Sequence, residues 1–259
     1  MPAPLLRTLW LVLLLAAAER VLPATGHAAG WVDEQQYGVF VIRSDFPLRD
    51  VAELVAGLGE LQKDIEATLE LKCQNKPIEI YLFRNRWAYN SYVRKSVPDG
   101  DGRPALYVAG NDVGRVYAYR RAELETDLRH ETTHALLHNA LPYVPLWLDE
   151  GLAEYFENPA ALRAAGSPHR RNLAFAIRLG WRPNLAELEA KRTLAEMGGR
   201  EYRDAWGWVH FLLHGPPEAR AALQEFLTTI PTGREPTPLS ISLRRRIPDL
   251  ERRVVEHLR

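Results

Sequence analysis

Residues 130–134 read HETTH, and this pentapeptide decides how the rest of the chain is interpreted. The run from Ala122 to Leu141 contains no Gly or Pro, so we expect a helix that carries the pentapeptide near its centre. Histidines at positions i and i+4 of a helix lie on one face, about 40° apart around its axis. Both imidazoles can therefore reach a single Zn²⁺ at about 2.0–2.1 Å. The pattern predicts a zinc site on this helix.

A third ligand is offered by the stretch WLDEGLAEYF at residues 147–156. A catalytic zinc uses three protein ligands and keeps one coordination position open. Glu150 is the best candidate to join His130 and His134, and Asp149 is the runner-up.

Two further features of the HETTH helix concern its chemistry. Glu131 lies between the two histidines in sequence and can act as general base toward a water molecule that the metal activates. Metzincins extend the motif with a Gly and a third His, but Leu137 and Ala140 occupy those positions, which excludes that class. His138 lies about 80° around the helix axis from His130, so we expect it to be a surface or capping histidine.

Together the two stretches resemble those of the gluzincin zinc metallopeptidases, the peptidase MA-like group related to thermolysin and aminopeptidase N. In that family the third ligand is a Glu on a following helix, within a W-L-x-E-G-x-A-x-Y phrase that residues 147–155 match closely. As an architecture the resemblance covers approximately residues 37–213. It implies one Zn²⁺ per chain. The connection from His134 to Glu150 is shorter than in thermolysin or the aminopeptidases, which suggests a minimal domain.

The resemblance also implies roles for two residues outside the ligand set. In thermolysin the ligand Glu is followed at i+4 by an acidic residue, so Glu154 is expected to accept a hydrogen bond from His130 and fix its tautomer. In the aminopeptidase-like members a Tyr at the start of a later helix stabilises the oxyanion, and Tyr202 matches it by position. The Gly that usually stands three residues further on is Ala205 here. The alternative donors are Tyr143, Tyr155 and His210.

Hydrophobic periodicity elsewhere predicts an α+β fold. By resemblance this is a zincin-like metallopeptidase domain, in which an N-terminal mixed sheet with helices precedes the active-site helix and a mostly helical C-terminal lobe. Either strand of a predicted hairpin around Gly110-Asn111-Asp112 could bind extended substrate, or its edge could be covered. The expected strands are 37–42, 78–83, 105–109 and 113–119, and the expected helices are 46–71, 85–95, 201–214 and 249–258.

The N-terminal segment has the pattern of a secretory signal peptide. Arg7 precedes the apolar run Leu9–Ala18, and small residues follow, so cleavage is expected after Ala28 or, alternatively, after Ala18. The run is too short to cross a bilayer, which needs about 20 residues, although an uncleaved anchor is an alternative. We therefore expect a periplasmic or secreted protein without a membrane span in its mature form.

We expect the chain to be organised into three segments. Residues 1–28 form the signal peptide, residues 29–230 the gluzincin-like domain, and residues 231–259 a linker and C-terminal helix. Within the domain, the N-lobe extends to about residue 120, the zinc helices cover 121–158, and a helical C-lobe follows.

The composition of the chain limits the classes of molecule that it is expected to bind. The chain has 46% hydrophobic and 25% charged residues, and its formal net charge of zero argues against nucleic acid as a main partner. Its single cysteine, Cys73, allows no internal disulfide and is expected to be a packed or semi-exposed structural residue. The sequence does not indicate an oligomeric state.

The expected function is an exported zinc metallopeptidase that hydrolyses peptide bonds in a peptide or protein substrate. The G-x-M-E-N phrase with which aminopeptidases bind the substrate amino terminus does not occur in the sequence, so non-terminal cleavage is favoured. Two alternatives stay open. One is a zinc-bearing but catalytically idle peptide-binding or assembly module on the same scaffold, and the other is a zinc hydrolase of a non-peptide substrate.

Overall fold

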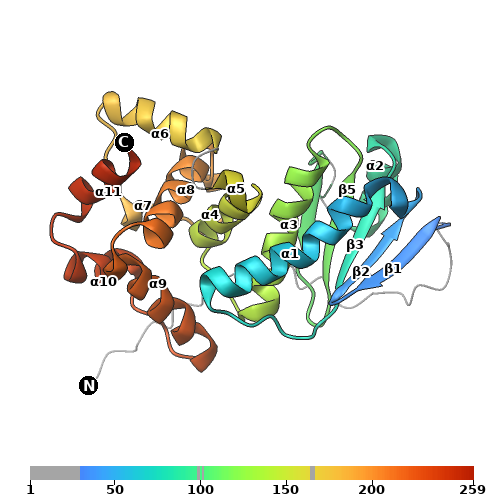
Figure 1. Ribbon diagram of the computed structural model, residues 1–259, viewed down its shortest axis with the longest axis horizontal. Helices are drawn as coiled ribbons and strands as arrows, with labels where there is room; N and C mark the ends of the chain where they lie inside the picture. Colours follow the sequence, from blue (N-terminus) through green and yellow to red (C-terminus); the bar gives the residue numbers. More distant parts are fainter. Residues whose placement is uncertain (1–29, 98–99, 101, 164–166) are drawn as a thin grey trace, which may run out of the picture.

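A five-stranded mixed sheet forms one side of the molecule (Figure 1), in the order β1-β2-β3-β5-β4. The computed structural model describes residues 30–97, 100, 102–163 and 167–259. The three inner strands are parallel, and the strand at each edge is antiparallel to its neighbour. The α+β class is thus confirmed. The strands are β1 (Asp33–Tyr37), β2 (Phe40–Ser44), β3 (Ile78–Phe83), β4 (Ala105–Val108) and β5 (Gly114–Tyr119).

Helices cover both faces of the sheet and make up the rest of the described chain (Figure 1). The longer ones are α1 (Ala52–Leu69), α2 (Arg86–Ser96), α3 (Leu124–Ala140), α4 (Leu146–Phe156), α6 (Pro168–Arg178), α8 (Gly199–His214) and α9 (Pro217–Thr229). The shorter ones are α5 (Ala160–Arg163), α7 (Leu185–Glu189), α10 (Leu239–Arg246) and α11 (Leu250–Leu258), with 3₁₀ turns at Leu48–Val51, Leu194–Glu196 and Ile230–Thr232.

The alternation of side chains along β3 explains why both faces of the sheet are covered. Ile80 and Leu82 belong to the main hydrophobic core, which also includes residues of α1 and α3. Tyr81 and Phe83 point to the other face and form a separate cluster with residues of α2. Because successive side chains of a strand point to opposite faces, a strand this apolar must be buried on both sides. The sheet is therefore a rigid base for α3.

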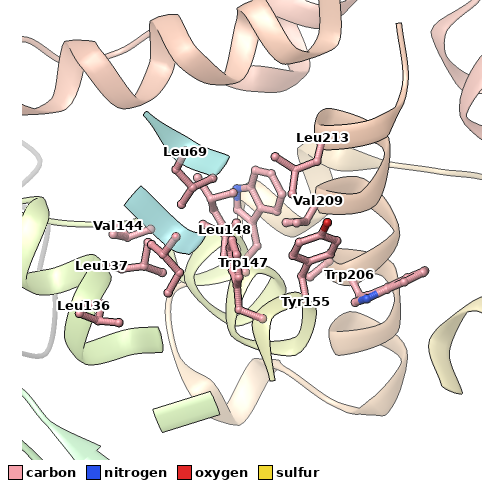
Figure 2. Packing of buried hydrophobic residues seen from close by; sticks show 14 of the residues in the cluster. Leu69, Leu136, Leu137, Val144, Trp147, Leu148, Tyr155, Trp206, Val209 and Leu213 are labelled. Atoms are coloured by element: carbon pink, nitrogen blue, oxygen red, sulfur yellow. The ribbon is translucent and has the colours of Figure 1, made fainter. Parts of the chain in front are cut away.

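Helix α4 lies between α3 and α8 and is buried on nearly all sides. Figure 2 shows its side chains packed against α3 on one side and α8 on the other. The labelled residues are Leu136 and Leu137 of α3, Trp147, Leu148 and Tyr155 of α4, Trp206, Val209 and Leu213 of α8, and Leu69 and Val144 nearby. Gly151 permits the close approach of α8, because a Cβ there would lie 2.8 Å from the carbonyl oxygen of Ala205.

The structure corrects the expected first strand. Residues 37–42 do not form one strand but span a hairpin, in which β1 ends at Tyr37 and β2 begins at Phe40. Gly38 makes the turn with a φ of 58°, a conformation that glycine adopts without steric cost. The sequence pattern did not reveal β1 because it is an edge strand whose residues DEQQY are mostly polar and exposed. Helix α10 was also not predicted, whereas α11 confirms the expected final helix.

Two smaller expectations can be compared with the structure. Cys73 is half-buried and packs against the main core, and burial raises the pKa of its thiol to about 12. No helix in the described ranges has both the length and the apolar character needed to cross a membrane. The expected signal peptide, residues 1–28, lies outside the described residues.

Candidate metal centre

Three side chains from two consecutive helices converge on one point. His130 and His134 project from α3, which ends before Pro142, and Glu150 projects from the following helix α4. Oε2 of Glu150 lies 3.6 Å from Nε2 of His130 and 3.8 Å from Nε2 of His134. The ligand atoms of all three residues lie within 4.8 Å of one another, so this group could hold a metal ion.

The distances agree with what a bound zinc requires. Ligand bonds of about 2.0–2.2 Å in tetrahedral geometry place neighbouring donor atoms about 3.3–3.5 Å apart. The observed separations of 3.6 and 3.8 Å are only slightly longer. Two imidazole nitrogens and one carboxylate oxygen also form a donor set that zinc favours in catalytic sites. The residues therefore fit the metal that the sequence predicts.

A carboxylate faces the remaining ring nitrogen of each histidine. Nδ1 of His130 is 3.1 Å from Oε2 of Glu157, within hydrogen-bond distance. Nδ1 of His134 is 2.9 Å from Oδ1 of Asp149, an ion-pair contact whose angle is outside the hydrogen-bond range. Both contacts leave Nε2 directed toward Glu150, because a carboxylate near Nδ1 favours a proton on that nitrogen.

Asp149 connects two histidines of α3. Besides its contact with His134, its Oδ2 lies 2.9 Å from Nε2 of His138. The ring of Tyr107, on β4, stacks on His134 and His138 with centroids 6.4 and 5.7 Å away. His138 thus lies in the last turn of α3, partly exposed, and contacts Asp149 and Tyr107. The sequence offers Asp149 as nearby negative charge and as the runner-up ligand, and in the structure it contacts both histidines across the α3–α4 pair.

The expected role of Glu154 is also corrected. Its Oε2 lies 2.7 Å from Nε2 of His169 at the start of α6, whereas the hydrogen bond at His130 involves Glu157. Glu157 is three residues further along, seven after Glu150, and so lies on the same face of α4 as Glu150 and Glu154. That i+7 spacing is the signal in the sequence that could have identified it.

The charges around the histidines raise their pKa values in the metal-free protein. Burial alone would lower the pKa of His130, but the carboxylates of Glu150, 3.6 Å away, and of Glu157 hold it well above its ordinary value. Burial opposes the same effect at His134, where Asp149 raises the pKa to about 9. The pKa of Asp149 is correspondingly lowered by the two histidines that it faces. Metal binding at this centre must therefore displace protons.

The two predicted catalytic residues lie in the same electrostatic environment. Glu131 is half-buried on α3, and its carboxylate makes no hydrogen bond within the described part of the chain. Tyr202 lies in the first turn of α8, where burial and the charge of Glu150 raise the pKa of its hydroxyl to about 12. Glu131 contributes to the raised pKa values of both His130 and Tyr202. Tyr202 is therefore protonated at neutral pH and is available as a hydrogen-bond donor.

The alternative donors have other surroundings. The hydroxyl of Tyr155 lies 2.7 Å from Nε2 of His214, and Nδ1 of His210 lies 2.8 Å from Nε2 of His257 on α11. Burial and then the charge of Glu235, on the segment between α9 and α10, raise the pKa of Tyr143. None of these contacts involves the His130, His134 and Glu150 group, so Tyr202 remains the best candidate donor.

In comparisons with known proteins, no protein-family model and no curated protein match the chain. The geometry of the site and the sequence motifs carry the functional argument by themselves.

Proposed function

We propose that this chain is an exported zinc metallopeptidase of the gluzincin type, with a zincin-like fold, that hydrolyses peptide bonds. One observation carries the proposal. Nε2 of His130, Nε2 of His134 and Oε2 of Glu150 converge at metal-ligand spacing, on helices whose sequences match both parts of the gluzincin motif. When bound there, Zn²⁺ would act as a Lewis acid that polarises a substrate carbonyl and lowers the pKa of water.

Glu131 is the proposed general base. It follows His130 on α3, and its carboxylate makes no hydrogen bond in the described ranges, so it is free to accept a proton from the attacking water. The same carboxyl group then donates that proton to the leaving nitrogen as the peptide bond breaks. Glu131 performs both transfers without changing its position on the helix.

Tyr202 is the proposed donor to the oxyanion. Its raised pKa keeps the hydroxyl protonated at the pH at which peptidases act, so it can donate a hydrogen bond as negative charge develops on the carbonyl oxygen. Because it belongs to α8, its distance from Glu150 depends on the packing of α8 against α4.

The position of β4 supports an extended peptide as substrate. β4 is an edge strand of the sheet, paired with β5 on one side only. Its Tyr107 stacks on His134, so the strand runs beside the proposed zinc ligands. An edge strand offers unpaired main-chain groups to which an extended chain can add by β-augmentation. Between the two strands of the predicted hairpin, β4 is therefore the one we assign to substrate binding.

Two variants test the proposal with purified protein. Glu131→Gln keeps the shape of the side chain but removes the base, so it should retain zinc while peptide hydrolysis falls by about 10²–10⁴-fold. Glu150→Ala should release zinc as well as activity. Hydrolysis of a mixed-sequence peptide library, with and without a chelator, and zinc content measured on the same samples provide the two readouts.

The outcomes separate the alternatives. A protein that takes up no zinc at micromolar metal would refute the metal centre. A protein that binds one zinc but cleaves no peptide, and whose biological role survives Glu131→Gln, is a zinc-bearing binding module instead. Export is tested separately by N-terminal sequencing, which should find a mature chain that begins at Ala29 or Glu19.

A further inference from the structure

We propose that Glu157 and Arg129 are positioning residues for the metal centre: Glu157 orients the ligand His130, and Arg129 holds Glu157 in place. This inference rests on the proposed zinc site and extends it. It departs from the expectation derived from thermolysin, in which the residue at the position of Glu154 has that role.

Glu157 lies at the point where α4 ends. The helix extends to Phe156, and Glu157 is its C-terminal cap, with its backbone N–H donating to the carbonyl oxygen of Ala153. Its Oε2 is 3.1 Å from Nδ1 of His130, and its side chain is only 16% exposed. The residues that cap a helix often fray because the last carbonyls lack partners within the helix. An orienting carboxylate at this position therefore needs the helix end to be fixed.

Arg129 supplies that fixation. Its Nε donates to the carbonyl oxygens of Phe156 and Glu157 at 3.2 and 3.1 Å, and one of its terminal nitrogens reaches the carbonyl oxygen of Asn158 at 3.4 Å. Three consecutive carbonyls at the end of α4 are thus bound by one planar guanidinium. A positive charge at this position also interacts favourably with the negative end of the helix dipole.

The burial of this arginine indicates that the contact is specific. Arg129 is 9% exposed, and desolvation together with the charge of nearby Arg163 lowers its pKa. Arg163 itself donates to the carbonyl oxygen of Asn158 at 3.2 Å, while its guanidinium lies over the ring of Phe156. Two buried cations side by side are unfavourable unless acceptors or counter-charges surround them; here Arg163 pairs with Asp64 at 2.7 Å, while the carbonyl oxygens at the end of α4 accept from Arg129.

Arg129 is directly connected to the proposed ligand His130 through the backbone of α3. Arg129 is adjacent to His130 in α3, so the residue that holds the end of α4 and the residue that Glu157 orients share one turn of helix. The separation between Nδ1 of His130 and Glu157 therefore depends on two contacts: that of Arg129 with the end of α4, and that of Glu157 with His130. Displacing the end of α4 would break the contact between Glu157 and His130 without removing a metal ligand.

Glu154 provides a matched control on the same helix. Its side chain is also 16% exposed and also hydrogen-bonds a histidine, but that histidine is His169, which is not one of the proposed ligands. Glu157→Gln and Glu154→Gln are thus chemically identical changes at equally buried positions. They differ in the histidine that each carboxylate hydrogen-bonds, although the ligand atoms of His130, Glu154 and Glu157 all lie within 4.8 Å of one another.

The experiment measures zinc affinity of the purified protein by competition with a chromophoric chelator. Loss of a partner that orients a ligand typically costs about 10–100-fold in metal affinity. Glu157→Gln should weaken zinc binding by about this factor, and Glu154→Gln by less than about threefold on the same scale. Thermal melts of the zinc-free variants provide the control for folding. An equal or larger loss in Glu154→Gln would overturn the assignment.

Arg129→Lys tests the second residue, because lysine keeps the charge but cannot bind three carbonyls with one planar group. It should weaken zinc binding by about tenfold in the natural background and by much less when Glu157→Gln is already present, since the two residues act through one another. Equal losses in both backgrounds would show that Arg129 acts independently and would refute its positioning role. Wild-type protein that binds no zinc would instead refute the underlying metal centre, a result distinct from either of these.

Discussion

Replacing Gly151 with alanine tests how closely α4 and α8 must approach for the site to form. Gly151 follows the proposed ligand Glu150 and faces α8. A Cβ at this position would lie 2.8 Å from the carbonyl oxygen of Ala205 and 2.9 Å from Cγ2 of Val209. The carbonyl belongs to the backbone of a helix and cannot rotate away, so the two helices must separate.

The size of the effect follows from two opposing contributions. Bringing the contact from 2.8 to an ordinary 3.4 Å requires a displacement of 0.6 Å. Overpacking of this kind costs about 1–3 kcal/mol. Alanine is favoured over glycine within a helix by about 1 kcal/mol, which offsets part of that cost. The free energy of unfolding should therefore fall by as much as about 2 kcal/mol, and each 1 kcal/mol lost lowers the melting temperature by about 2–4 °C.

Gly57 is the matched control. It lies inside α1, where a Cβ would meet nothing within 4 Å. Gly57→Ala should gain the helix preference without a clash and raise the melting temperature by about 2–4 °C. The two glycine-to-alanine changes thus have opposite expected signs, although a scale of helix preference alone predicts stabilisation by both.

Differential scanning calorimetry and peptide hydrolysis provide the measurements. Because Glu150 is on α4 and Tyr202 on α8, separating the helices changes the distance between them, and misplacement by about 1 Å can cost about 10²-fold in rate. We expect Gly151→Ala to melt at lower temperature and to hydrolyse peptide more slowly. If it were stabilised to the same extent as Gly57→Ala and kept full activity, the argument from close helix packing would be refuted.

Further predictions concern the site. Tyr202→Phe should lower the rate of hydrolysis by about 10²–10³-fold, whereas a purely structural tyrosine would lower stability instead of rate. His134→Ala should abolish the stabilisation by zinc, which for wild type amounts to about 2.7 kcal/mol when free zinc is at 100 times Kd. Zinc affinity should rise with pH through about 9, because zinc displaces protons from His134 and from His130, whose pKa is also raised, and Asp149→Asn should lower the pH at which the contribution of His134 levels off. Conversely, calorimetry of the metal-free protein should find that the stabilisation due to this raised pKa is complete below about pH 6.5 and lost as pH rises through about 9.

The parts of the site that were predictable from the sequence are those governed by helix geometry within one element. The i, i+4 spacing places His130 and His134 on one face of α3, and the structure shows both directed at Glu150. Their surroundings depend on how α3 and α4 cross, which local spacing does not specify. For this reason the contact of Asp149 with His138, and that of Glu157 with His130, emerged only from the structure.

A similar limit applies to the fold. The strand β3 was predictable because it is a strongly apolar run, interrupted only by Glu79, and is buried on both faces. The edge strand β1 was not, because half-exposed edges carry polar residues and lose the alternating pattern that marks a strand. Helix α10 was not predicted because it is short and ends in the charged Arg244–Arg246 run, although its Leu239 and Leu243 are buried.

The short connection between α3 and α4, residues 141–145, has a consequence for the order in which the molecule assembles. All three proposed metal ligands come from residues 130–150, so their convergence requires only a local helical hairpin. Local contacts form faster than those that close long loops, because less chain entropy must be lost. Tyr202, in contrast, joins the site only when α8 docks. During refolding, capacity to bind zinc should therefore return before hydrolytic activity, and the interval between the two signals would report the docking of α8.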